Sequence, residues 1–196
     1  KNLIQEFNNL SKEKPLSLSM GKMKYRNMDE FTKIIAKGTV DRSKKIFFPA
    51  KTLNGKNGYF IASLLTDNHN NQYLLDEGWF EYNKYDYFKK NSDIISTDIL
   101  GYLRYPTKKK FFTPKNSPET NEWYYYDLKE IQKFFGIEIN QKFFIKNMSN
   151  YGEEFLFPST VKHNFSNNHF QYAITWFLMS FSILIIFIIY LIRKYR

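Results

Sequence analysis

The side chains that could carry out chemistry in this chain are few and widely separated. Three histidines occur, His69, His163 and His169, and no two of them have the spacing of a zinc-binding helix. The chain has no cysteine, which excludes a thiol nucleophile, a thiolate metal site and a disulfide framework. It also has neither a serine-hydrolase elbow nor a phosphate-binding glycine loop. This inventory predicts a protein that is not an enzyme.

Acidic and aromatic residues in the middle of the chain have structural explanations. Asp76 and Glu77 are adjacent in a predicted strand, so their side chains should point to opposite faces and not act as a carboxylate pair. Asp127 is better explained as the cap of a helix. Trp79 and Trp123 are expected in the core, and they would gain functional weight only if they were exposed near a membrane surface.

His169 differs from the other histidines because it directly precedes a long apolar segment. From Tyr172 to Ile192 there is no charged residue and no proline, and a helix of this length spans about 31 Å, close to one hydrocarbon core. Aromatic residues at both ends, Tyr172 and Trp176 at one and Tyr190 at the other, fit the two membrane interfaces. The segment is therefore predicted to span a lipid bilayer.

A basic tail of three cations within residues 193–196 follows this segment and predicts its orientation. Positive charge collects on the cytoplasmic side of a membrane or in the mitochondrial matrix, so the C-terminus should lie there. Everything before Tyr172 should then lie on the opposite side. The expected division is a domain over residues 1–165 and a transmembrane helix with its basic tail over residues 166–196.

The charge of the chain is +10, and the part before the predicted helix has 26 basic and 19 acidic residues. A moderately basic surface of this kind can be simply solvated. The densest basic run is Lys108–Lys110, and no stripe of aromatic and arginine residues accompanies it as in a single-strand binding groove. Nucleic acid is therefore not a predicted partner.

Strands dominate the predicted structure before the membrane segment. Periodicity and turn residues predict a strand over Phe31–Val40 and, after a charged turn, a second strand over Lys45–Phe48. A hairpin of Tyr59–Leu65 and Gln72–Leu75 is predicted next. Two later strands are predicted over Ile94–Arg104 and Lys142–Asn147. Asn54-Gly55 and Asn57-Gly58 are both predicted turns, and residues 83–92 form a polar stretch.

Two short helices complete the prediction. One begins after Asp127 and stops at Gly136, and the other covers Asn2–Leu10. The fold class is α+β: a small β-rich extramembrane domain with one or two helices, followed by a C-terminal transmembrane helix. Because the chain starts at Lys1, an N-terminal transmembrane helix is expected to be absent from it.

Several short motifs follow one another along the chain in a fixed order. They comprise Gly58-Tyr59, Gly78-Trp79, Gly101–Arg104, Phe112–Asn116 with Pro114 and Asn116, Trp123, Asp127, and the segment Asn167–Phe177 with His169, Gln171, Tyr172, Thr175 and Trp176. In this order the chain resembles the Surfeit locus protein 1 family, membrane proteins that assist the assembly of cytochrome c oxidase. The likeness covers nearly the whole chain, and Asn167–Phe177 is its most specific part.

The resemblance implies a function, a partner and a location. Family members are thought to assist insertion or stabilisation of haem a in the largest subunit of the oxidase, complex IV of the respiratory chain. By this resemblance His169 is the candidate ligand of the haem iron, with Tyr172 and Trp176 as further haem contacts. The chain would lie in the mitochondrial inner membrane or a bacterial plasma membrane, with its domain on the intermembrane-space or periplasmic side.

Other interpretations stay open. Ser166, Glu77 and Glu81 stand where the family usually has other residues, and such changes would suit a permanent accessory subunit of a divergent oxidase or respiratory supercomplex. An unrelated binding module anchored by its tail is a third possibility. His169, Gln171 and Tyr172 could also be interfacial residues that anchor the helix or contact a neighbouring one.

Overall fold

The computed structural model describes residues 14–18, 29–107, 109–150, 154–158 and 169–195. The chain divides into two compact units, residues 1–161 and residues 162–196. The first unit, called here the barrel domain, contains all of the strands among the described residues, and the second contains the helix α4, His169–Lys194. The predicted helix Asn2–Leu10 lies outside the described residues.

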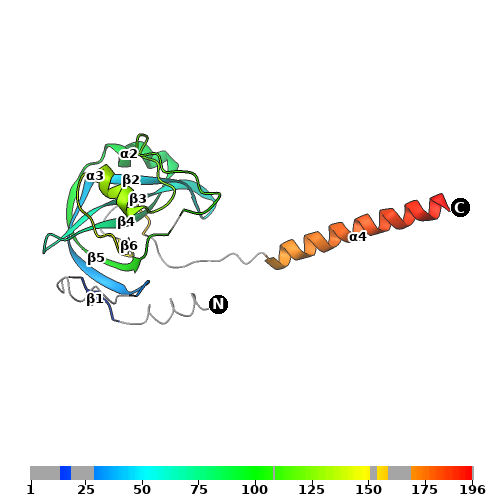
Figure 1. Cartoon of the computed structure of the whole chain (residues 1–196), viewed down its shortest axis with the longest axis horizontal. Coiled ribbons are helices and arrows are strands. Elements are labelled where there is room, and N and C mark those ends of the chain that lie inside the picture. Colours follow the sequence, from blue (N-terminus) through cyan, green and yellow to red (C-terminus); the bar gives the residue numbers. More distant parts are fainter. Residues whose placement is uncertain (1–13, 19–28, 108, 151–153, 159–168, 196) are drawn as a thin grey trace. The chain divides into compact units, whose positions relative to one another are not determined.

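The strands of the barrel domain form one closed sheet (Figure 1). In the order of the chain they are β1 Leu16–Ser17, β2 Lys33–Leu53, β3 Lys56–Asp67, β4 Gln72–Glu81, β5 Ile94–Arg104 and β6 Phe144–Asn147. Their order in the sheet is β1-β2-β3-β4-β6-β5, and β2 also pairs with β5, which closes the barrel. The pairs β1–β2 and β4–β6 are parallel, and the others are antiparallel.

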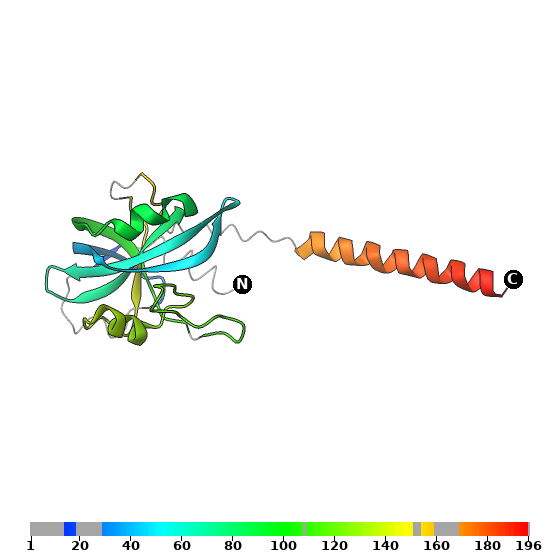
Figure 2. The same cartoon turned by 90° about the horizontal axis from the view of Figure 1, so that it is seen from above.

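Helix α3, Leu128–Phe135, has the ends that the sequence predicts. The side chain of Asp127 accepts hydrogen bonds from the backbone N–H groups of Lys129 and Glu130, both at 3.1 Å, and Gly136 ends the helix at φ 68°. A one-turn 3-10 helix, η2 Tyr82–Lys84, leads into α2, Tyr85–Lys90, which lies within the stretch described from the sequence only as polar. Figure 2 shows α2 and α3 on different sides of the strands.

Three clusters of buried side chains hold the barrel domain together. The barrel interior contains a cluster that includes Ile34, Val40, Leu65, Tyr73, Leu75, Ile99 and Leu103. A second cluster packs α3 against the outside of the sheet and includes Phe48, Leu74, Trp123, Leu128, Ile131 and Phe144. The third joins α2 to the strands through Phe47, Ile61, Phe80, Phe88 and Leu156. Burial of this apolar surface stabilises the fold.

The prediction of a charged turn after Val40 is wrong. Strand β2 runs without a break from Lys33 to Leu53, and its pairing with β3 shifts register between Asp41 and Lys45, as at a β-bulge. The charged segment stays in the sheet because Arg42, which is fully buried, has an acidic partner in β4.

The predicted hairpin and strand Ile94–Arg104 are confirmed as β3–β4 and β5. Of the two predicted turns, Asn54-Gly55 connects β2 to β3, whereas Asn57-Gly58 lies within β3.

Candidate functional site

The start of α4 carries the most specific of the sequence motifs. His169 is the first residue of α4; its side chain, like all of Asn167, lies outside the described part of the structure. The helical repeat places Tyr172, Ala173 and Trp176 on the same face as His169. Tyr172 and Trp176 are 62% and 65% exposed, so two aromatic rings are available on this face.

Helix α4 is long and apolar enough to cross a membrane from Gln171 to Lys194, and none of it is buried within the structure. Two of its hydroxyl groups bond to the helix itself: Thr175 Oγ1 donates to the carbonyl of Tyr172 at 2.8 Å, and Ser182 Oγ donates to that of Leu178 at 2.9 Å. Satisfied in this way, they add little to the cost of placing the helix in hydrocarbon.

The face of His169 can be compared with what a haem requires. An imidazole can ligate iron, and aromatic side chains can pack on the macrocycle. Tyr172 and Trp176 supply two exposed rings, and the small Ala173 between them leaves room for a flat group. In size and shape Tyr172, Ala173 and Trp176 are compatible with one face of a flat macrocycle. Among the residues that the structure describes, no group of three or more His, Asp or Glu side chains could hold a metal ion.

The Gly78-Trp79 motif attaches the segment 154–158 to β4. The backbones of Trp79 and Phe157 exchange hydrogen bonds of 2.8 and 2.7 Å, and the Trp79 ring is buried with its Nε1 donating to the carbonyl of Lys51 at 3.0 Å. Gly78 has φ 142°, and a Cβ atom at this position would lie 2.3 Å from the Phe157 carbonyl oxygen. The motif therefore has a structural role, and Trp79 is a core residue as predicted.

The motif around Pro114 and Asn116 anchors the long connection between β5 and α3. Asn116 Nδ2 donates to Glu130 Oε2 at 2.8 Å, and Asn116 Oδ1 accepts from the backbone N–H of Tyr124 at 2.9 Å. Trp123 is fully buried, and its backbone N–H donates to the carbonyl of Phe47 at 2.8 Å. Pro114 is exposed. These contacts explain Asn116 and Trp123 by the folding of the connection.

Two buried charge clusters were missed by the sequence analysis. Arg42 and Glu77 form a fully buried ion pair, and Ser63 donates a hydrogen bond to Glu77. Glu77 and its neighbour Asp76 have separate partners, as expected for side chains that point to opposite faces of a strand. Arg42 and Glu77 are visible as charged residues in the sequence, but nothing in the sequence indicates that they pair with each other.

The second cluster surrounds Asp76, which is fully buried. Its Oδ2 accepts a hydrogen bond of 2.7 Å from the Tyr126 hydroxyl and lies 3.2 Å from Lys146 Nζ, while its Oδ1 has no hydrogen-bond partner among the described residues. Burial, and then the Asp76 carboxylate, raise the pKa of the Tyr126 hydroxyl well above its ordinary value. The Tyr126 ring stacks on Phe144 at 4.1 Å, which places the cluster beneath α3.

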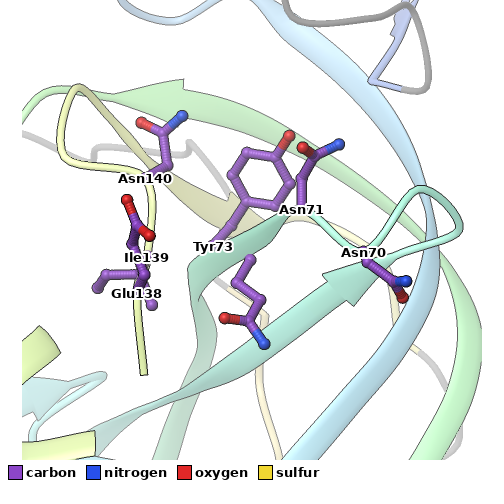
Figure 3. Close-up of a pocket in the computed structure, with 7 residues that line it drawn as sticks. Asn70, Asn71, Tyr73, Glu138, Ile139 and Asn140 are labelled. Atoms are coloured by element: carbon purple, nitrogen blue, oxygen red, sulfur yellow. The ribbon is translucent and has the colours of Figure 1, made fainter. Parts of the chain in front are cut away.

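A hollow of about 410 Å³ lies between the β3–β4 loop and the segment after α3 (Figure 3). Its lining is mostly amide side chains and includes Asn70, Asn71, Gln72, Tyr73, Glu138 and Asn140. The backbone N–H of Asn140 donates to the carbonyl of Gln72 at 2.8 Å, so the two segments are joined at its base. This lining does not pair a nucleophile with a base.

Comparison with known proteins agrees with the motifs. A family model described as the SURF1 family matches residues 1–181. A SURF1-like protein of Rickettsia conorii is 26% identical over 140 residues, which cover 69% of this chain and 58% of that protein. Human Surfeit locus protein 1 is 24% identical over 197 residues, which cover 91% of this chain and 65% of that protein.

A SURF1-like protein of Dictyostelium discoideum is 25% identical over 238 residues, covering 97% of this chain and 86% of that protein. The chain thus spans less than two thirds of the length of the rickettsial and human relatives. The family model, in contrast, extends from the first residue through the first half of α4, so it includes both the barrel domain and the motif at the start of the helix. The chain therefore belongs to the SURF1 family.

Proposed function

We propose that this chain is a membrane-anchored assembly factor for cytochrome c oxidase and acts on the largest subunit of that enzyme. The observation that carries the proposal is the family match over residues 1–181. The length and apolar composition of α4 support a place in the membrane, beside a client that is itself a membrane protein. The role is one of binding and release rather than catalysis.

Haem a is the proposed cargo, and the start of α4 is its proposed contact. His169 would supply an imidazole to the iron, and the exposed rings of Tyr172 and Trp176 would pack against the macrocycle. In the assembled oxidase the haem supplies electron-transfer chemistry. This chain would only hold the haem, or the subunit that receives it, in a suitable orientation.

The orientation in the membrane follows from the basic end of α4. Arg193 and Lys194 occupy its last turn, and the first turn has no acidic residue. We therefore place the C-terminus in the matrix or cytoplasm and the barrel domain on the intermembrane-space or periplasmic side. The membrane is the mitochondrial inner membrane or a bacterial plasma membrane.

The alternative of a permanent accessory subunit drew on Ser166, which lies outside the described residues, and on the unusual acidic residues Glu77 and Glu81. Glu77 is fully buried against Arg42, and Glu81 pairs with Lys56, so both charges have partners within the barrel domain. Neither residue therefore supports the idea that this chain has lost a surface for binding a client. The assembly role needs no such change and is preferred.

Stoichiometry tests the proposed role. The full chain would be expressed in cells that lack their own SURF1 family protein, and the oxidase purified in mild detergent. We expect more oxidase and more haem a per largest subunit than in cells without the chain, with only traces of the chain in the mature enzyme. A one-to-one ratio that survives purification would contradict the assembly role and identify a resident subunit.

The haem contact has its own test. The full chain, purified from cells that make haem a, would be compared with His169→Ala and with Leu178→Ala, which changes the opposite face of α4. We expect the absorbance of copurified haem to be lost in His169→Ala and kept in Leu178→Ala. Equal haem content in both variants would mean that His169 only anchors the helix at the interface.

A further inference from the structure

Two phenylalanine rings are exposed together on the connection between β5 and α3. Phe111 and Phe112 are each 93% exposed, and their ring centroids lie 4.9 Å apart in an edge-to-face contact. Most of the described phenylalanines in the barrel domain are buried or packed against a core cluster. Two adjacent exposed rings form an apolar patch that water solvates poorly, and such a patch marks an interaction surface.

Along the sequence, the charged residues next to this pair are all basic. Between Tyr105 and Pro118 the sequence contains four lysines and no acidic residue. Lys109 and Lys110 are exposed directly before Phe111. Basic side chains beside aromatic rings are the combination that binds the interface of an anionic membrane, where the rings enter the headgroup region and the ammonium groups meet phosphates.

The backbone presents the two rings on a fixed base. The N–H of Thr113 donates to the carbonyl of Lys110 at 3.1 Å, which closes a turn with Phe111 and Phe112 at its tip. Behind the turn, Asn116 is bonded to Glu130 of α3 and to the backbone of Tyr124. An open hollow of about 420 Å³ lies beside the connection, and its charged lining residues are Lys109, Lys129 and the helix-capping Asp127, two cations against one anion.

We propose that this tip, residues 109–113, is a second membrane contact of the chain, one that binds an anionic lipid surface. The occupant is assigned to lipid on two grounds. The charge of the tip is complementary to lipid phosphates, and α4, which could cross a bilayer, belongs to the same chain. That covalent link keeps lipid headgroups at a high effective concentration near the tip, so a weak contact can be occupied. The contact is separate from the proposed oxidase role.

The absence of cysteine makes a direct test possible, because one introduced cysteine can be labelled alone. Full-length Thr113→Cys would carry an environment-sensitive fluorophore within the tip, directly after the two rings, and Asn57→Cys, in an exposed part of β3, would carry the same fluorophore as a control. Both proteins would be placed in nanodiscs of phosphatidylcholine alone, or of phosphatidylcholine with phosphatidylglycerol. Spin-labelled lipids would then report whether either fluorophore reaches the bilayer.

We expect a blue-shifted emission and quenching at Thr113→Cys in the anionic nanodiscs, a weaker effect in phosphatidylcholine alone, and none at Asn57→Cys. Adding Phe111→Ser and Phe112→Ser should abolish the shift, and adding Lys109→Gln and Lys110→Gln should remove its dependence on anionic lipid. Since all four side chains are exposed, unfolding curves of these variants should match the parent and so exclude misfolding.

Two results would overturn the proposal. In the first, the emission at Thr113→Cys would equal that at Asn57→Cys in every lipid mixture. In the second, the emission would stay unshifted in both mixtures and change only when the largest oxidase subunit is added, which would assign the tip to a protein partner instead. Either result could occur with the assembly role intact, because oxidase yield is measured independently.

Discussion

The guanidinium group of Arg42 in β2 holds the carboxylate of Glu77 in β4 inside the barrel domain. Arg42 Nε and Nη2 lie 3.0 and 2.8 Å from Glu77 Oε2, and both side chains are fully buried. Ser63 of β3 donates to the same carboxylate, and Asn147 Nδ2 of β6 donates to the Glu77 backbone carbonyl at 3.0 Å. Four strands thus meet at one polar cluster.

Arg42→Met should leave Glu77 buried without its counter-charge. We expect the free energy of unfolding to fall by about 3 to 5 kcal/mol, the usual effect of removing one partner of a buried ion pair. The double variant Arg42→Met/Glu77→Leu should be more stable than Arg42→Met alone, since no unpaired charge remains. Denaturant unfolding of the full chain in detergent, followed by tryptophan fluorescence, measures both; a double variant less stable than the single one would contradict this account.

Gly78→Ala should destabilise the domain more than a typical glycine substitution. The new methyl group would lie 2.3 Å from the Phe157 carbonyl oxygen, and the residue would also be strained at φ 142°. We expect a loss of about 3 kcal/mol, the upper end of the cost of a strained backbone site. Gly55→Ala is the matched control, because it has φ 78° and no atom within 4 Å of the new Cβ. Equal losses in the two variants would assign the effect to backbone conformation alone.

Asn116→Asp tests whether Asn116 has the structural role that its contacts indicate. The substitution replaces the amide donor that faces Glu130 at 2.8 Å with a second carboxylate oxygen. We expect the unfolding free energy to fall by about 2 kcal/mol from the lost hydrogen bond and the new repulsion. Glu130→Gln in the same background should restore much of it. An unchanged unfolding curve for Asn116→Asp would show that the contact adds no stability.

Tyr126 should make the stability depend on pH in the alkaline range. The folded chain raises the pKa of Tyr126 well above its ordinary value of 10.0, first through burial and then through the Asp76 carboxylate. Below the ordinary pKa both states hold the proton, and the stabilising contribution is fully present. Above it the unfolded state releases the proton first, so the contribution is lost as pH rises.

The effect of Tyr126 on stability can be checked by measuring the free energy of unfolding between pH 8 and about pH 11, a range that includes the ordinary tyrosine pKa. Tyr126→Phe should lose stability less steeply than the parent as pH rises. Tyr87→Phe, which changes a tyrosine that is 46% exposed, should keep the slope of the parent. If all three proteins had parallel curves, Tyr126 would not be the group responsible.

Local features of the fold were predictable from the sequence, whereas its long-range charge pairs were not. The bounds of α3 follow from Asp127 and Gly136, which act on the backbone within a few residues, and β5 follows from its apolar pattern. Arg42 and its partner Glu77 are 35 residues apart, and no periodicity indicates which acid a buried arginine will meet. The same lack of a local signal concealed α2 and the contact between Tyr126 and Asp76.

The candidate site shows the same division. The residue spacing alone places Tyr172 and Trp176 on the face of His169, because one helix contains all three. The exposure of Phe111 and Phe112 depends instead on how the connection after β5 folds back against α3. A hydrophobic pattern cannot distinguish an exposed pair of rings from a buried one, so their environment required the structure.

The pairing of β2 with β5 has a consequence for the order of folding. Lys33 pairs with Tyr102 and Asp41 with Ile94, so the ring of strands closes through contacts between residues some sixty positions apart. Such non-local contacts raise the contact order and slow the search for the native state, because the entropy of closing a long loop is lost before the pairing is gained. The meander β2–β3–β4 can form early, but the backbone groups of β2 that pair with β5 stay unpaired until β5 folds onto them. During that interval the chain is open to mispairing with other strands, and a chaperone that shields these groups would raise the yield of folded protein.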